Sequence, residues 1–380
     1  MKKFLGFLLV IVLGAGTYFY IYNNPQRKAL RAAQTAAEQG DADAQLALGK
    51  IYVSGQGVPP SAQTAADWFS RSAAQGNAQA AYELAQLYLS GEQLPRDVDG
   101  GLSYLKLSAE KGYSAAQYML GRLYQTGAEN LEPNPVQAVF WWIQAAVQGD
   151  ADAQNALNDA QNQTPEIYEQ ARHMNDLRQA AVQGDGQAAL TLARAYQIGQ
   201  PLAQNTDAAA QWFLKAAEQN LPQAQYELAL LYGADEGPLP KDEAKVLQYL
   251  EQAAQSGYAP AQYALGEKIY QSAQTPEDFQ KALDWFGQAA KQNHAGALYM
   301  CGIMYMQGQG TQASIPQAIA AFKQAADLGH ANAQYVVGQS YWRGIGLRPS
   351  KSKALQWLEL AKQNGNAQAE ALIAEINAGK

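Results

Sequence analysis

The pattern of small and apolar residues along the chain repeats with a period of about 36 residues. Ten positions carry Gly or Asn at successive spacings of 35 to 37 residues, and an Ala follows each of them four positions later. Gly and Asn adopt the left-handed conformation that ends many helices more readily than other residues do. We therefore interpret each position as the end of a helix and call it an anchor. The anchors are Gly40, Gly76, Gly112, Gly149, Gly184, Asn220, Gly257, Asn293, Gly329 and Gly365.

An apolar stripe follows each anchor and predicts a first helix. The eighth residue after an anchor is always apolar, and the ninth is Gly or Ala except at Asn158. The twelfth residue is Tyr in seven of nine units, from Tyr52 to Tyr341. Positions four residues apart drift by only about 40° around a helix, so these residues share one face. The small ninth residue would let a second helix approach closely.

A second helix is predicted before the next anchor. A large ring such as Trp68 or Trp285 stands eight residues before most anchors, and Ser or Ala stands four residues before each of them. The segments between the two helices contain Gly and Pro, as in 55–60 and 344–349, and these residues break helices. One such pair cannot bury its own apolar stripe, whereas stacked pairs share a continuous core.

The repeated unit resembles the Sel1-like repeat, a relative of the tetratricopeptide repeat. The family pattern is A-x-A-Q-Y-x-L-G-x-x-Y-x-x-G, and residues 331–344 read ANAQYVVGQSYWRG. Residues 42–55 read ADAQLALGKIYVSG, with Leu46 in place of the first Tyr. The resemblance implies an all-α, right-handed α-solenoid of about nine helix–turn–helix repeats. It also implies a protein that binds partners and is not an enzyme.

The anchors divide the chain into segments. The fourth unit is degenerate, because Asn158, Gln161 and Asp176 replace its small residue, its Tyr and its aromatic ring. It is interpreted either as a drifted repeat that bends the stack or as a hinge between two solenoid segments. The expected segments are a membrane segment at 1–24, a leading half-repeat helix at 25–40, repeats one to three at 41–149, the degenerate repeat four at 150–184, repeats five to nine at 185–365 and a C-terminal capping helix at 366–380.

The N-terminus carries a membrane signal. Two lysines precede an uncharged run from Phe4 to Tyr22, whose nineteen residues nearly span a hydrocarbon core of about 30 Å as a helix. An uncleaved transmembrane helix is favoured over a cleaved signal peptide, because the apolar run continues past the small residues 14–16. We therefore expect a single-pass protein of the bacterial inner membrane with periplasmic repeats. Export after signal cleavage is the alternative.

Composition and charge narrow the function further. The chain of 380 residues contains 72 Ala and 48 Gln, which favour helices over a sheet. Residues 32–380 hold 22 basic and 34 acidic side chains, so the basic face that a nucleic-acid binder needs is not expected. No nucleic-acid partner is therefore predicted.

The candidate chemistry is sparse, so neither a catalytic site, nor a metal site, nor a cofactor is predicted. Cys301 occupies an apolar position and is expected to be a buried, unreactive thiol. His294 and His330 each follow an anchor, so their spacing is the repeat period and not that of metal ligands. The S-x-x-K match at 108–111 lacks the other motifs of the enzymes that use it.

A partner-binding face is predicted on the first helices. The sixth residue after an anchor is often Tyr and points away from the partner helix of its own pair. The resemblance implies that the first helices line a concave groove, where positions ten and thirteen add further apolar residues. Packing between neighbouring repeats also explains these rings. The candidate partner-binding residues are Tyr82, Tyr118, Tyr226, Tyr263, Tyr270, Tyr299, Ile303, Met306, Tyr335 and Trp342.

These features predict a non-catalytic, membrane-tethered adaptor that holds another envelope protein in its groove. A glycan-binding or assembly factor for peptidoglycan or exopolysaccharide is the second hypothesis, because aromatic rings stack on sugars. A hydrolase or β-lactam-binding activity is a remote third, known from a Cys-rich branch of the similar family. This sequence lacks the cysteine pairs of that branch.

Overall fold

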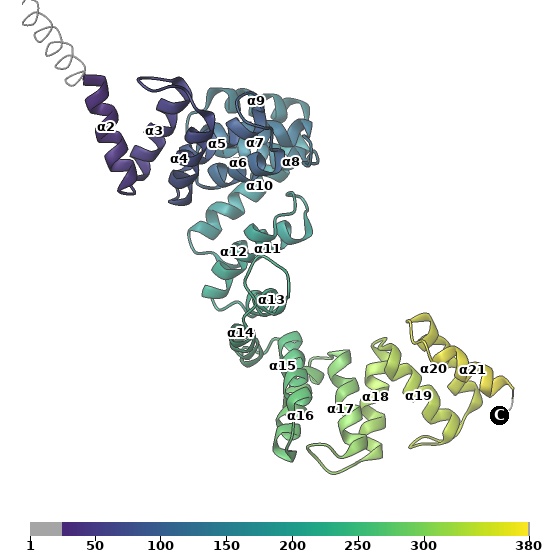
Figure 1. Cartoon of the computed structure of the whole chain (residues 1–380). Helices are drawn as coiled ribbons and strands as arrows, with labels where there is room; N and C mark the ends of the chain where they lie inside the picture. The colour runs from purple at the N-terminus through teal and green to yellow at the C-terminus, as the bar shows by residue number, and fades with distance from the viewer. Residues whose placement is uncertain (1–24, 379–380) are drawn as a thin grey trace, which may run out of the picture. The chain divides into compact units, whose positions relative to one another are not determined.

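The computed structural model describes residues 25–378, which form twenty α-helices and no β-strand. Figure 1 shows these helices following one another in pairs. The expected membrane segment Phe4 to Tyr22 lies outside the described residues. Among the helices from α2 to α21, none is long and apolar enough to cross a membrane.

The chain divides into two compact units, and the division falls inside one helix, between Asp176 and Leu177. Unit 1 also includes residues 199–203, and unit 2 comprises 177–198 and the residues from 204 onward. The helices of unit 1 are α2 (Pro25–Glu38), α3 (Ala42–Ser54), α4 (Ala62–Ala74), α5 (Ala78–Ser90), α6 (Val98–Glu110), α7 (Ser114–Thr126), α8 (Pro135–Val147), α9 (Ala151–Gln163) and the first part of α10 (Pro165–Val182).

Unit 2 begins with the end of α10 and continues through eleven further helices. These helices are α11 (Gly186–Ile198), α12 (Thr206–Glu218), α13 (Pro222–Gly233), α14 (Glu243–Gln255), α15 (Ala259–Ser272), α16 (Pro276–Ala290), α17 (Ala295–Gln307), α18 (Ile315–Asp327), α19 (Ala331–Arg343), α20 (Lys351–Gln363) and α21 (Ala369–Asn377).

Helix pairs stack within each unit. A first helix packs against the second helix of its own pair, as α3 does with α4 and α17 with α18. The second helix then packs against the first helix of the next pair, as α4 does with α5 and α18 with α19. This is the contact pattern of an α-solenoid, and the all-α prediction is confirmed.

The anchors end the second helices, as predicted. All eight glycine anchors have positive φ angles, from 86° at Gly329 to 102° at Gly184. The two asparagine anchors, Asn220 and Asn293, have φ angles of 57° and 62°. Asn tolerates this conformation better than most residues, which explains why it alone replaces Gly here.

The close approach of the two helices in a pair depends on the small ninth residue after each anchor. A Cβ atom built on Gly266 would lie 2.8 Å from the ring of Phe286, and one on Gly338 would lie 2.7 Å from Leu358. Both contacts are shorter than real side chains tolerate, so Gly is needed where the facing residue is bulky. The prediction that a small residue at this position allows the second helix to pack closely is confirmed.

The facing bulky residue differs from the predicted one by a single position. The sequence pattern suggested the ring eight residues before the anchor, but those rings are half-buried in most units, as at Trp68 and Trp285. The fully buried residue stands seven before the anchor, as at Phe69 and Phe322. Adjacent helical positions differ by about 100°, so both residues border the interface and only one enters it.

Buried glutamines connect three successive helices. Gln45, on α3, donates a hydrogen bond to the carbonyl of Ala37 on α2 at 3.0 Å. Its own side-chain oxygen accepts a 2.8 Å hydrogen bond from Gln75, at the end of α4. We call this arrangement the glutamine bridge. It recurs at Gln117 with Gln148, Gln262 with Gln292 and Gln334 with Asn364.

The degenerate fourth unit has a shorter connection between its helices than the other repeats. Only Thr164 separates α9 from α10. Asn158 and Gln161 lie on α9 and are exposed. Their polar side chains stand where the other repeats carry the residues that receive a second helix. The interpretation of this unit as a hinge stays a hypothesis.

One glutamine bridge is incomplete, and completing it should stabilise unit 2. The side-chain oxygen of Gln225 is buried and has no hydrogen-bond partner among the described residues, because Ser256 stands where Gln75 stands in the first repeat. Serine is too short to reach it. We expect Ser256→Gln to supply the donor and to raise the free energy of unfolding by about 1 kcal/mol, measured by chemical denaturation.

The control for this prediction is Ser256→Met, which has similar length and no donor. The gain should be absent in Ser256→Met and should also disappear when Ser256→Gln is combined with Gln225→Met. Equal stabilisation by the glutamine and methionine variants would contradict the explanation.

Candidate interaction surface

The ten predicted partner-binding residues all lie on first helices. Tyr82 and Tyr118 lie in unit 1, on α5 and α7. The other eight follow one another along unit 2, on α13, α15, α17 and α19. Met306 is 37% exposed, and the other nine residues are half-buried. We call the part on α17 and α19, with Tyr299, Ile303, Met306, Tyr335 and Trp342, the first-helix face.

The tyrosines six residues after the anchors pack between repeats. The ring of Tyr263 stacks on His294 with a centroid distance of 4.6 Å, and Tyr299 stacks on His330 at 4.5 Å. Tyr82 contacts Tyr113 in the same register. These rings therefore contact the neighbouring repeat, in agreement with the interpretation that they serve packing between repeats. Since they are only half-buried, each also presents part of its surface to solvent.

The hydroxyl groups on this side stay protonated at neutral pH. Tyr263 donates a 2.5 Å hydrogen bond to Glu267, and burial together with this carboxylate raises the pKa of Tyr263. Burial also raises the pKa of Tyr299. Both side chains are consequently neutral. Each can pack its apolar ring against a partner while its hydroxyl forms a hydrogen bond.

The first-helix face carries almost no charge. Helix α17 has no charged residue, and α19 has only Arg343 in its last turn. Ile303 and Trp342 pack against the hydrophobic core of the last repeats without being fully covered. A partner could cover this surface without desolvating ionised groups, which is the main cost of burying a charged face.

A groove that the sequence analysis missed lies between second helices α14 and α16. Its volume is about 870 Å³, and α15 forms its floor. We call it the α14–α16 groove. Its apolar residues are Leu247, Leu265, Ile269 and Trp285. The sequence feature that points to this groove is Ile269. It replaces the tyrosine that stands twelve residues after the anchor in seven of nine units.

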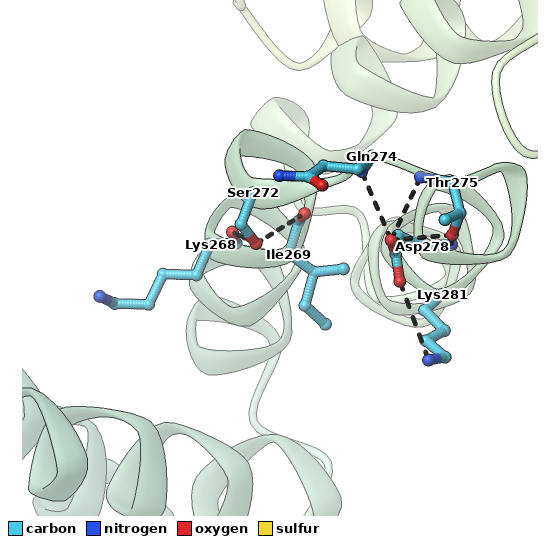
Figure 2. Close-up of polar contacts among 7 residues, drawn as sticks. All are labelled: Lys268, Ile269, Ser272, Gln274, Thr275, Asp278 and Lys281. Carbon is cyan, nitrogen blue, oxygen red and sulfur yellow. Dashed lines mark hydrogen bonds and ion pairs between the residues drawn. The ribbon is translucent and has the colours of Figure 1, made fainter.

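The turn beside this groove is short and firmly capped. Only residues 273–275 separate α15 from α16. Figure 2 shows Asp278 accepting hydrogen bonds from the backbone and hydroxyl of Thr275, at 3.2 and 2.8 Å. Lys281 lies 4.0 Å from the other oxygen of the same carboxylate. These hydrogen bonds lower the pKa of Asp278, so the carboxylate stays ionised and the helix start stays in place.

A second, smaller hollow lies beside the groove, between α13 and α15. Its volume is about 370 Å³, and Leu230, Val246 and Leu250 contribute apolar lining. A 2.8 Å ion pair between Lys268 and Glu243 contributes to both hollows. Glu267, whose carboxylate accepts the hydrogen bond from Tyr263, also lines this hollow.

The reactive side chains serve structural roles. Cys301 is 3% exposed, and burial raises its pKa to about 12, so the thiol is neutral. The hydroxyl of Ser108 donates a 2.6 Å hydrogen bond to the carbonyl of Ala78. Within residues 25–378, no group of three or more His, Cys, Asp or Glu residues has a geometry that could hold a metal ion.

Two histidines act as helix N-caps. Nδ1 of His294 accepts a hydrogen bond from the backbone N–H of Ala297, and Nδ1 of His330 accepts one from Ala333, both at 3.2 Å. Desolvation by burial lowers the pKa of both imidazoles. The neutral form is the one that can accept these bonds.

Comparison with protein families identifies the repeat. The Sel1 repeat profile matches residues 42–77, 78–113, 114–150, 186–221, 222–258, 259–294, 295–330 and 331–366. Residues 151–185 are left unmatched, and they correspond to the degenerate unit.

Two solved structures are similar along most of the chain. A protective antigen present in uropathogenic Escherichia coli strains, which displays an SLR fold, is 25% identical over 96% of this chain and 86% of its own, with a TM-score of 0.50. A Sel1 repeat protein from Oxalobacter formigenes is 25% identical over 93% of this chain and 92% of its own, with a TM-score of 0.48. Comparison with curated proteins gives no match.

The histidine caps predict a pH-dependent stability of unit 2. In the folded chain, the pKa of each of these two imidazoles lies below its unfolded value of about 6.5. As the pH falls, the unfolded chain therefore binds protons at these histidines before the folded chain does. The neutral caps should contribute fully to the free energy of unfolding above about pH 6.5, and this contribution should decline below it. Replacing both residues, by His294→Asn and His330→Asn, should flatten this decline while keeping the caps, as Asn77 caps α5.

The measurement is the free energy of unfolding between pH 5 and 8. The control is His173→Asn, because His173 is exposed and caps no helix. An unchanged pH slope in the double variant would show that other groups cause the decline.

Proposed function

Because this chain belongs to the Sel1 repeat family, we propose that it is a protein-binding scaffold without catalytic chemistry of its own. Stacked Sel1 and tetratricopeptide-like repeats typically mediate protein–protein interactions. The observation that carries the proposal is the first-helix face, an aromatic and methionine-bearing surface on which α17 has no charge and α19 has only Arg343. Tyr, Trp and Met are typical anchors of binding surfaces, since they bury large areas and adapt to the partner.

The partner should offer a predominantly apolar surface to this face. Tyr299 and Tyr335 are held by packing between repeats, so little side-chain entropy is lost when they are covered. Met306 lies one turn away from Ile303 and is flexible enough to fill the gaps in the contact. A rigid aromatic centre with an adaptable edge supports protein binding.

We also propose a location for this scaffold. We infer from the sequence that Phe4 to Tyr22 anchors the protein in the bacterial inner membrane with its repeats in the periplasm. The partner would then be another envelope protein that the scaffold recruits to the membrane. Export after cleavage of the same segment would leave the binding proposal unchanged.

A charge placed on the first-helix face should abolish partner capture. We expect Met306→Lys to weaken binding at least tenfold, because the partner would have to bury an unpaired ammonium group. Met306 is partly exposed, so the variant should fold. The matched control is Gln125→Lys, at the equivalent repeat position of α7 in unit 1, where the side chain is exposed.

The experiment is light crosslinking in the native host, detergent extraction of membranes and identification of the proteins that co-purify. Enrichment of one envelope protein with the wild type and Gln125→Lys, and its loss with Met306→Lys, would support the proposal. Retention of peptidoglycan or exopolysaccharide without any enriched protein would contradict it and favour a glycan-handling module.

A further inference from the structure

The seventh repeat lacks an aromatic contact that the second and sixth repeats contain. In the sixth repeat, the tyrosine twelve residues after the anchor, Tyr232, stacks on Tyr249 with a centroid distance of 5.9 Å and an interplanar angle of 10°. Tyr88 and Tyr104 form the same contact in the second repeat, at 6.2 Å. The seventh repeat keeps the second ring of the pair, Trp285, but has Ile269 in place of the first.

The missing ring leaves space in the α14–α16 groove. Trp285 and Ile269 both line the groove, whose volume of about 870 Å³ exceeds that of one aromatic side chain several times. Leu247 lines the opposite wall and is 42% exposed. An indole ring and aliphatic side chains therefore face a cavity of the size that commonly receives a ligand group.

The charges around the groove favour a cation beside the apolar contact. Lys268 is paired with Glu243, and Lys281 lies beside Asp278. Glu251 also lines the groove, is exposed, and forms no ion pair or hydrogen bond with the described residues. The rim thus holds one uncompensated carboxylate next to an open aromatic ring.

We propose that the α14–α16 groove binds a segment of a protein partner that presents an aromatic side chain next to a lysine or arginine. The aromatic ring would occupy the space of the missing tyrosine and pack on Trp285. A pair of packed aromatic rings contributes more binding free energy than its buried area alone predicts. The neighbouring cation would pair with Glu251. This inference rests on the proposed protein-binding function and adds a second surface, with a defined partner chemistry.

A sugar is less well matched to this groove. Sugars stack on indole rings, but they also need free hydrogen-bonding groups around the ring. The Glu243 carboxylate accepts a hydrogen bond from Lys268, and the Asp278 carboxylate accepts hydrogen bonds from the backbone N–H and the hydroxyl of Thr275. Glu251, Gln255 and Gln271 also line the groove, but its apolar wall of Leu247, Leu265 and Ile269 suits an aromatic side chain better than a sugar ring covered with hydroxyl groups.

The decisive variant fills the groove from within. Ile269→Tyr restores the residue that stands at this position in seven of nine repeats, so it should fold with at least the wild-type melting temperature. It should also occupy the space that the partner ring would take. Ile269→Leu is the matched control, because it keeps the volume of the side chain and adds no ring.

The probe is the blocked dipeptide N-acetyl-Tyr-Arg-amide, whose binding to the detergent-solubilised full chain is followed by saturation-transfer NMR. We expect saturable binding at millimolar concentration, unchanged in Ile269→Leu and weakened at least tenfold in Ile269→Tyr. Glu251→Gln should weaken this probe several-fold and leave N-acetyl-Tyr-Ala-amide unaffected, because only the first probe carries a cation.

Three results would overturn the inference. They are the absence of probe binding, equal binding to Ile269→Tyr and the wild type, and binding of N,N′-diacetylchitobiose in place of the peptide. The scaffold proposal is tested separately. If Met306→Lys abolishes capture of the partner while Ile269→Tyr changes nothing, the proposed function stands and the groove assignment fails.

Discussion

The close approach of the two helices in each pair is the contact on which the rest of the structure depends. A Gly or Ala on the first helix faces a buried Phe, Trp or Leu on the second, and at Gly302 an added Cβ would lie 2.5 Å from the ring of Phe322. Inserting extra atoms into such a contact typically lowers the free energy of unfolding by about 1–3 kcal/mol. Because each pair buries its apolar stripe fully only against the next pair, this local constraint sets the spacing of every repeat. The glutamine bridges then connect the ends of neighbouring helices.

The sequence predicted the periodic part of this structure well, since anchors, small residues and helix pairs follow from local patterns that recur along the chain. The deviation at Phe69 has a physical reason. Two adjacent residues both border a helix interface, and the partner helix decides which one enters it. The glutamine bridges join residues 30 or 31 positions apart, such as Gln45 and Gln75. Their pairing depends on the distance between helices, which no local pattern contains. The candidate tyrosines lie on the expected helices, and their role in partner binding stays a prediction.

Function in a repeat protein depends on the positions where the repeats differ. The common pattern builds the stack, and a site arises where one repeat carries other residues. In unit 2, α17 carries Ile303 where α11 has Arg194 and α15 has Glu267, and the seventh repeat replaces a tyrosine with Ile269. In the degenerate fourth unit, Asn158 and Gln161 replace the residues that would receive a second helix. The first two changes leave apolar surface open, and the third leaves polar side chains exposed on α9.

Hydrogen–deuterium exchange of the full chain, free and with its captured partner, tests most directly whether unit 2 is the binding unit. The account predicts slower exchange in α17 and α19, which carry the first-helix face, and in α14 and α16, which border the groove. Exchange in the helices of unit 1 should be unchanged. Protection that is confined to unit 1, or no protection in any of these four helices of unit 2, would contradict the account.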